Sequence, residues 1–172
     1  MIKVVCHDLE VFWIRILKSA SRSIRCSLFN GYPIRRKTEE HNHYRSFAVV
    51  RNPITRFASG AAMFCKHSPD ALLDNLLNDA ITPNRETSAA FAKLHTMPMT
   101  HPLYEISEGT KIFRFEDLGR GLKDLAEFVG VSPVPELLHL GERTNQIELT
   151  TRHVDRIKEI FAEDFARFGY KA

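Results

Sequence analysis

The sequence lacks long apolar runs, low-complexity tracts and Pro- or Gly-rich linkers. No stretch approaches the ~20 apolar residues of a membrane-spanning helix. The N-terminal residues carry Asp8 and Glu10 and lack a small-residue cleavage site, so no signal peptide is predicted. What remains is a globular chain of 172 residues, long enough to bury a core. We therefore predict a single domain over residues 1–172.

Cysteine is also scarce. Cys6, Cys26 and Cys65 are odd in number and widely spaced, which fits neither a disulfide framework nor a zinc motif. This pattern is typical of reduced thiols in a cytoplasmic protein. The eight histidines show no metal-ligand spacing, so we expect no metal site.

Positive charge is concentrated near the N-terminus. Residues 1–56 hold eleven Lys and Arg against four Asp and Glu, a net charge of +7, whereas the remaining residues hold thirteen against seventeen, a net charge of −4. A basic N-terminal third indicates an anionic ligand there, although a solvated basic face explains the charge equally well.

Segments with strand character alternate with segments of helical period. The expected strands are residues 2–6, 12–17, 46–50 and 111–116, and the expected helices are 22–30, 53–65, 69–81, 86–95, 118–131 and 150–170. Residues 32–45 are expected to be a polar connection. This alternation predicts an α/β fold with a mainly parallel central sheet flanked by helices. Lys18, Arg51 and Glu116 lie at the carboxyl ends of strands and should share the ligand-binding edge.

The segment "LKSASRS" joins an apolar strand to a basic helix. Exposed N–H groups at a helix N-terminus favour phosphate or sulfate, and Lys18, Ser19, Ser21 and Ser23 would add charge and hydroxyl donors. The segment lacks the glycines of G-x-x-x-x-G-K-[ST]. A serine-capped helix start with surface charges is the alternative.

The segment "RNPITRFAS" offers a second anion site. Asn52 is a good N-cap and is followed by proline, and the apolar positions of the helix lie opposite a polar face that carries Arg56 and Ser59. Arg51 can form a bidentate contact with a phosphate. The alternative is that Arg51 and Arg56 pair with carboxylates of the acidic C-terminal part.

Together these segments resemble a known family. "FWIRILKSASRSI" is similar to the loop motif F-I-H-I-P-K-T-A-G-T-S-I of sulfotransferases that use 3′-phosphoadenosine-5′-phosphosulfate (PAPS), and "VVRNPITRFAS" is similar to their V-R-N-P-x-x-R-x-x-S motif. "FEDLGRGLKDLAEFVGV", "KLHTMP" and "EDFARFGY" resemble three further segments of that family. The likeness is closest to the carbohydrate sulfotransferase branch, and it implies a P-loop-like three-layer sandwich.

The resemblance also implies roles for residues. Lys18 would hold the 5′-phosphosulfate, with Ser23 and the loop amides around the same phosphate. Arg51 and Ser59 would bind the 3′-phosphate, and Arg143 would supply a further contact with PAPS. In the loop, Leu17, Ser21 and Arg22 replace the motif's proline, glycine and threonine; Ser19, Ser21 and Arg22 count as cofactor-binding candidates with the others.

A general base must accept the proton of the acceptor hydroxyl. The resemblance places it some way after the loop, where the sequence offers Glu39, Glu40, His41 and His43. We rank Glu40 and His43 first, and a solvated charged loop is the alternative. His95 and His101 flank an irregular segment that is a candidate for the acceptor site.

The function predicted from the sequence is transfer of a sulfuryl group from PAPS to an acceptor hydroxyl on a small molecule or glycan. A P-loop kinase is disfavoured by the missing G-K-[ST]. A nucleic-acid-binding module would need more aromatic residues among the basic ones. A non-catalytic PAPS or anion binder stays open.

Overall fold

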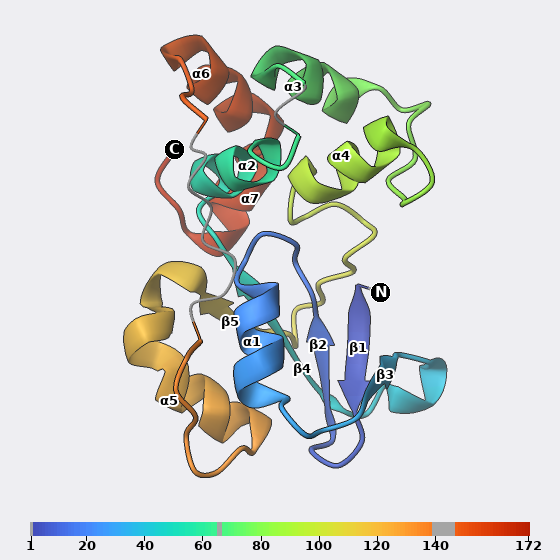
Figure 1. Ribbon diagram of the computed structural model, residues 1–172, viewed down its shortest axis with the longest axis vertical. Helices are drawn as coiled ribbons and strands as arrows, with labels where there is room; N and C mark the ends of the chain where they lie inside the picture. Colours follow the sequence, from blue (N-terminus) through green and yellow to red (C-terminus); the bar gives the residue numbers. More distant parts are fainter. Residues whose placement is uncertain (1, 65–66, 139–146) are drawn as a thin grey trace. The chain divides into compact units, whose positions relative to one another are not determined.

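The computed structural model describes residues 2–64, 67–138 and 147–172 (Figure 1). The chain divides into two compact units. The sheet unit comprises Met1–Val50 and Pro102–Glu142, and the helical unit comprises Arg51–His101 and Arg143–Ala172. This division concerns contacts and does not test independent folding, so the single domain expected from chain length stays a prediction.

A five-stranded sheet forms the centre of the sheet unit, in the order β3-β1-β2-β4-β5. The strands are β1 (Lys3–Cys6), β2 (Val11–Ile14), β3 (Ile34–Arg36), β4 (Arg45–Val50) and β5 (Lys111–Arg114). β4 runs parallel to both β2 and β5, whereas β1 runs antiparallel to β2 and β3. β1 is antiparallel to β2 because the connection between them is short, and parallel strands need a longer crossover. The α/β class is confirmed, with a mixed sheet whose central pairs are parallel.

The expectation of a purely polar connection over residues 32–45 is wrong. This stretch contains β3 and a short 3₁₀ helix, η1 (Glu39–His41). Among the described strands, β3 lies at the edge of the sheet and pairs only with β1. Charged side chains are tolerated on edge strands because the pairing uses backbone groups, so the Arg-rich sequence concealed the strand.

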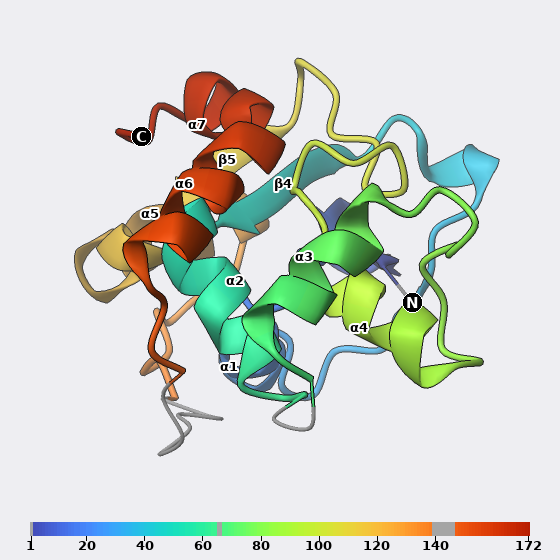
Figure 2. The same cartoon turned by 90° about the horizontal axis from the view of Figure 1, so that it is seen from above.

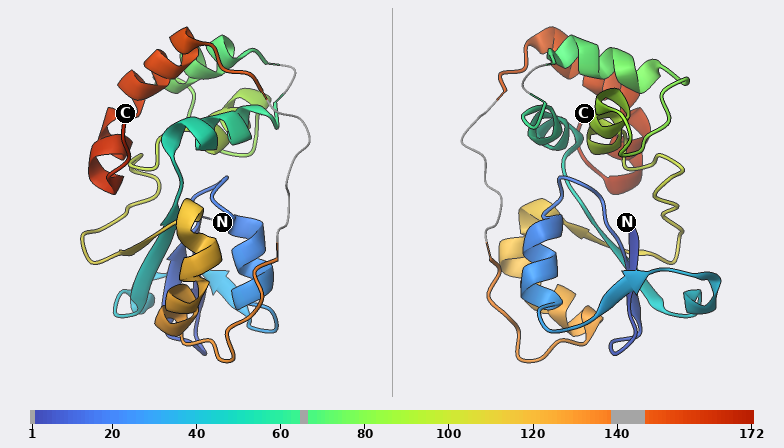
Figure 3. Two further views of the ribbon diagram at one scale, coloured as in Figure 1. Left: turned by 90° about the vertical axis from the view of Figure 1, so that its left-hand side faces the viewer. Right: turned by 45° about the vertical axis from the view of Figure 1, so that its right-hand side comes forward.

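Helices α1 (Ser21–Leu28) and α5 (Leu118–Val129) cover one face of this sheet (Figure 3). The core between them contains Trp13, whose ring stacks with Phe29 and Phe47 at centroid distances of 5.8 and 6.0 Å. A second 3₁₀ helix, η2 (Phe115–Asp117), leads from β5 into α5. α5 is followed by Gly130, whose φ of +89° is the left-handed conformation that glycine commonly adopts after the end of a helix.

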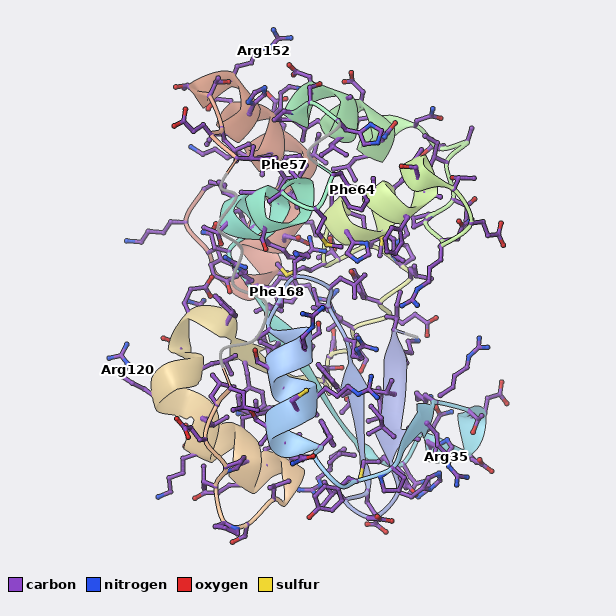
Figure 4. All side chains as sticks on the ribbon, viewed as in Figure 1. Arg35, Phe57, Phe64, Arg120, Arg152 and Phe168 are labelled. Atoms are coloured by element: carbon purple, nitrogen blue, oxygen red, sulfur yellow. The ribbon has the colours of Figure 1, made fainter. Side chains whose placement is uncertain are left out.

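The helical unit packs five helices around a second core (Figure 2). They are α2 (Pro53–Ala61), α3 (Pro69–Leu77), α4 (Ser88–Thr96), α6 (Thr151–Ile160) and α7 (Ala162–Phe168). Phe57 of α2 is fully buried and meets Phe161 edge-on at 6.3 Å (Figure 4 labels Phe57). The single terminal helix expected over 150–170 is in fact two helices, because the backbone leaves helical geometry at Phe161.

Close approach of α2 to α4 depends on Gly60. A Cβ at this position would lie 2.7 Å from the backbone oxygen of His95 and 3.0 Å from Cγ2 of Thr96. Only glycine fits this crossing without a shift of one helix.

The longest helix in the described ranges, α5, has 12 residues. Within those ranges, no helix has the length and apolarity needed to cross a membrane.

Candidate functional site

The loop between β2 and α1 makes its turn without glycine. Lys18 and Ala20 adopt left-handed backbone conformations, with φ values of +69° and +56°. Such a conformation costs a residue with a Cβ about 1–2 kcal/mol. Ser21, which replaces the glycine of the sulfotransferase motif, does not share this conformation, because it is the first residue of α1. The strain of the loop therefore lies at Lys18 and Ala20.

The Ser21 side chain closes the loop. Its hydroxyl donates a hydrogen bond of 2.8 Å to the backbone oxygen of Ile16, near the end of β2. A glycine could not make this bond. Arg22, the next residue, is exposed, and Ser23 is buried in the first turn of α1.

The N-terminus of α1 fits an anion. Its N-cap, Ala20, provides no side-chain hydrogen bond to the first helical N–H groups. Ser19, just before it, is 1% exposed, and its hydroxyl finds no hydrogen-bond partner among the residues that the structure describes. A buried hydroxyl without a partner is uncommon, and helix N-termini attract phosphate groups. With half-buried Lys18 in the same loop, these groups are suited to a phosphate or phosphosulfate.

In the helical unit, Arg51 directly precedes Asn52, the N-cap of α2. Its Nε donates to the Thr55 hydroxyl at 3.2 Å, and that hydroxyl lies 3.2 Å from the backbone oxygen of Asn52. Asn52 itself caps α2, since its Oδ1 accepts from the N–H groups of Ile54 and Thr55 at 3.0 and 3.3 Å. The first N–H groups of α2 are thus already satisfied, which leaves the Arg51 guanidinium as the candidate group for an anion there.

Thr55 was missed by the sequence reasoning. Thr55 and Ser59 are four residues apart on one face of α2, and Arg51, two residues before the helix begins, continues the same spacing. This spacing was visible in the sequence and could have identified Thr55 as the residue that orients Arg51.

Arg56 does not lie on an exposed polar face, contrary to the prediction. It is fully buried, and its Nη1 donates to the backbone oxygen of Met97 at 2.7 Å. Asp164 of α7, also fully buried, accepts from the backbone N–H groups of Met99 and Thr100 at 2.7 and 2.8 Å. Burial raises the pKa of Asp164, against the opposing effects of these hydrogen bonds and of the Arg56 charge. Arg56 and Asp164 thus hold the irregular segment after α4.

The candidate bases lie in and beside η1. Glu40 is exposed, and its Oε1 accepts from the Thr38 hydroxyl at 2.9 Å. His43 is exposed and packs edge-on against Tyr44 with a centroid distance of 4.6 Å. His41 is buried, with its ring nitrogens bonded to Thr38 and His7. Glu39, the first residue of η1, is exposed.

These candidate bases do not lie near Lys18, because they are at the opposite end of β2. His41 contacts His7, which follows Cys6, and Cys6 pairs with Val11 at the start of β2. The Lys18 loop leaves from the other end of β2. Four strand residues span about 10 Å. The assignment of Glu40 or His43 as the base therefore rests on sequence alone.

The remaining candidates from the sequence are Arg143, His95 and His101. Arg143 lies outside the described residues. His95 is buried beside Phe91, with a ring distance of 4.3 Å, and its Nδ1 is 2.9 Å from that residue's backbone oxygen. Burial, and then the charge of Lys93, lowers the pKa of His101. No group of three or more His, Cys, Asp or Glu residues within the described ranges is arranged to hold a metal ion.

Comparison with known proteins gives one match. The model of the sulfotransferase family matches residues 3–171, which is nearly the whole chain. The chain belongs to the sulfotransferase family. No curated protein and no solved structure matches it. The family resemblance inferred from the sequence is thus confirmed, and the α/β sheet with its strand–loop–helix start is consistent with the fold of a sulfotransferase. Assignment to the carbohydrate branch stays a prediction.

Proposed function

We propose that this sulfotransferase takes its sulfuryl group from PAPS and transfers it to an acceptor hydroxyl, in the first instance on a carbohydrate. The observation that carries the proposal is the start of α1, which has no side-chain cap, beside the buried hydroxyl of Ser19, which has no hydrogen-bond partner among the described residues. The widely spaced cysteines favour a reducing compartment, and the cytoplasm is the proposed location.

The β2–α1 loop would bind the 5′-phosphosulfate. Ser19, Ser23 and the first N–H groups of α1 would donate hydrogen bonds, and Lys18 would supply positive charge. Ser21 supports this role through its bond to Ile16, which shapes the loop from within. Arg22 is exposed in the first turn of α1, where it would add positive charge beside the phosphosulfate.

Arg51 and Ser59 would bind the 3′-phosphate. Arg51 is bonded to Val50, the last residue of β4, and β4 is the parallel neighbour of β2. Both anion-binding segments thus follow carboxyl ends of neighbouring parallel strands, the usual place for ligands in α/β sheets. Thr55 would hold the Arg51 guanidinium in position for a bidentate contact. Arg143 is kept as a further proposed contact, on sequence alone.

The reaction would be an in-line displacement at sulfur. The acceptor oxygen forms a bond to sulfur as its proton passes to a base, and the bond between sulfur and the bridging oxygen of PAPS breaks. Negative charge then develops on the departing phosphate, where Lys18 and the α1 N–H groups would stabilise it. The protein's part is positioning and electrostatic stabilisation, by analogy with phosphoryl transfer. Glu40 and His43 stay the proposed bases.

Ligand-induced thermal stabilisation tests the proposal. Adenosine 3′,5′-bisphosphate, added at about 100 times its Kd, should stabilise the protein by about 2.7 kcal/mol. For a chain of this length that corresponds to a rise in Tm of about 5–10 °C. ATP with Mg²⁺ and a single-stranded oligonucleotide are measured in the same way, because the kinase and nucleic-acid interpretations predict stabilisation by these ligands instead.

Arg51→Ala should abolish most of this rise, whereas Arg120→Ala should preserve it. Arg120 is a matched control because its side chain is 93% exposed and points away from α5 (Figure 4). No rise with the bisphosphate, or a rise that survives Arg51→Ala, would refute the two-phosphate site. Transfer of labelled sulfate to a panel of glycans and small alcohols then separates an enzyme from a non-catalytic PAPS binder.

A further inference from the structure

Two lysines lie side by side on the face of the sheet that α1 and α5 do not cover. Val4 belongs to the core under those helices, so the side chain of Lys3, its neighbour in β1, points to the other face. β1 and β3 pair with Val4 opposite Arg36, and one residue further along the backbone N–H of Lys37 donates to the backbone oxygen of Lys3 at 3.2 Å. Like charges directly opposite each other on two paired strands repel. This pair of lysines therefore favours an anion beside it.

The chain places one of its own carboxylates there. Glu105 forms an ion pair with Lys3, and among the described residues no other carboxylate lies within 4 Å of the ammonium group of Lys3 or Lys37. The Lys3 side chain is 21% exposed, whereas that of Glu105 is 72% exposed. Glu105 also has a φ of +47°, a backbone conformation that disfavours residues with a Cβ. An exposed carboxylate on a strained backbone leaves for water more easily than Lys3 does, so Glu105 is the replaceable partner.

Both lysines line a cavity of about 410 Å³ in the sheet unit. The half-buried ring of Phe12 lines it too, with the Lys37 Nζ atom 5.1 Å from the ring centroid. Asn42 accepts a hydrogen bond from Lys37 through Oδ1, and its side-chain N–H groups have no partner among the described residues. The hydroxyl of Ser107, an exposed residue, completes this side of the lining. The cavity thus combines positive charge, an aromatic ring and uncharged polar groups.

We propose that this cavity binds a hydroxylated ring that carries a carboxylate, and that the ligand's carboxylate replaces Glu105 on Lys3. Lys3 and Lys37 would donate charge-assisted hydrogen bonds to that carboxylate. Ring C–H groups would pack on Phe12, and ring hydroxyls would pair with the polar groups of the lining, which a hydrocarbon ring would leave without partners. Sugar acids and carbocyclic hydroxy acids share this chemistry. The inference does not depend on sulfuryl transfer.

Calorimetric titration with D-glucuronate and with quinate tests the proposal and distinguishes the two sources of the ligand. Each of three further probes lacks one feature: cyclohexanecarboxylate lacks the hydroxyls, D-glucose lacks the carboxylate, and inorganic sulfate lacks the ring. At least one of the two hydroxylated acids should bind about fivefold or more tightly than all three. The tighter of the two identifies the source. Binding of inorganic sulfate as tight as that of both acids would overturn the proposal.

Three variants test the replacement of Glu105. Glu105→Gln should tighten binding of the acid about two- to fivefold, because it removes the exposed ion pair that competes with the ligand. A folding defect cannot produce such a gain. Lys3→Met should weaken binding about tenfold or more. Arg36→Met is the matched control, since Arg36 is an exposed cation of β3 that pairs with Val4 and so lies on the other face.

The control should leave the affinity unchanged. Unaltered affinity in Glu105→Gln, or equal losses in Lys3→Met and Arg36→Met, would show that the ligand does not take the place of Glu105 and would refute the inference.

Discussion

Replacing Gly60 with alanine should destabilise the helical unit, although the same change usually strengthens a helix. Gly60 lies inside α2, where alanine is favoured over glycine by about 1 kcal/mol. The new Cβ would, however, lie 2.7 Å from the His95 backbone oxygen, a distance that side-chain carbons do not tolerate. Because both groups belong to packed helices, the contact can be relieved only if α2 and α4 separate.

Overpacking of this kind lowers the free energy of unfolding by about 1–3 kcal/mol, and the higher helix propensity of alanine offsets about 1 kcal/mol of this loss. We therefore expect Gly60→Ala to lower the free energy of unfolding by up to about 2 kcal/mol. Gly121→Ala is the matched control. Gly121 lies inside α5, and a Cβ added there would meet no neighbouring atom within 4 Å, so the same substitution should stabilise by up to about 1 kcal/mol.

Urea unfolding followed by two signals separates the two effects. Trp13 is the only tryptophan and reports on the sheet unit, whereas far-UV circular dichroism reports on both units. Gly121→Ala should raise the fluorescence midpoint, and Gly60→Ala should lower the midpoint of the helical signal. If both variants raise the midpoints, the close packing of α2 on α4 is wrong.

Three further predictions concern buried polar groups and strained backbone. Asp164→Ala leaves two buried backbone N–H groups without an acceptor, so the free energy of unfolding should fall by about 2–5 kcal/mol; unchanged urea midpoints would contradict this. The hydrogen bond from His153 lowers the pKa of Asp70 below its ordinary value of 3.8. The ionised carboxylate therefore stabilises the folded protein above pH 3.8, and this stabilisation is lost as the pH falls through the pKa of Asp70 in the folded state. Asp70→Asn should therefore flatten the acid-induced fall in Tm below about pH 4, and an unaltered slope would speak against the pairing. Ala20→Val should lower Tm and Ala20→Gly should not, because a β-branched residue tolerates a φ of +56° least; equal effects would place the strain elsewhere.

Local chemistry made part of this structure predictable. Asn52 and the proline after it fixed the start of α2, and Gly130 fixed the end of α5, because caps depend on residues adjacent in sequence. The alternation of strands and helices gave the α/β class for the same reason. The two segments proposed to bind anions were identified from spacing and charge, and their role stays a prediction, although the family match covers both of them.

Long-range pairing could not be predicted. The helical period put Arg56 on the polar face of α2, but that face is covered by a segment held by Asp164, which is more than one hundred residues away. β3 was missed because its pairing with β1 uses backbone groups and leaves no apolar pattern. The position of Glu40 and His43 likewise depends on the pairing of β4 with β2, which a single sequence does not reveal.

The absence of glycine from the β2–α1 loop can be explained by the backbone strain and the unpaired polar groups in that loop. Lys18 and Ala20 are strained, the first N–H groups of α1 have no side-chain cap, and the Ser19 hydroxyl is buried with no partner among the described residues. Each feature lowers stability, and glycine at position 20 or a capping aspartate would remove some of the cost. A bound anion would offset the last two together, since it would accept hydrogen bonds from both the hydroxyl and the helix. Strain concentrated in this way is typical of ligand-binding segments, so the missing glycine is itself an argument for a phosphate-binding loop.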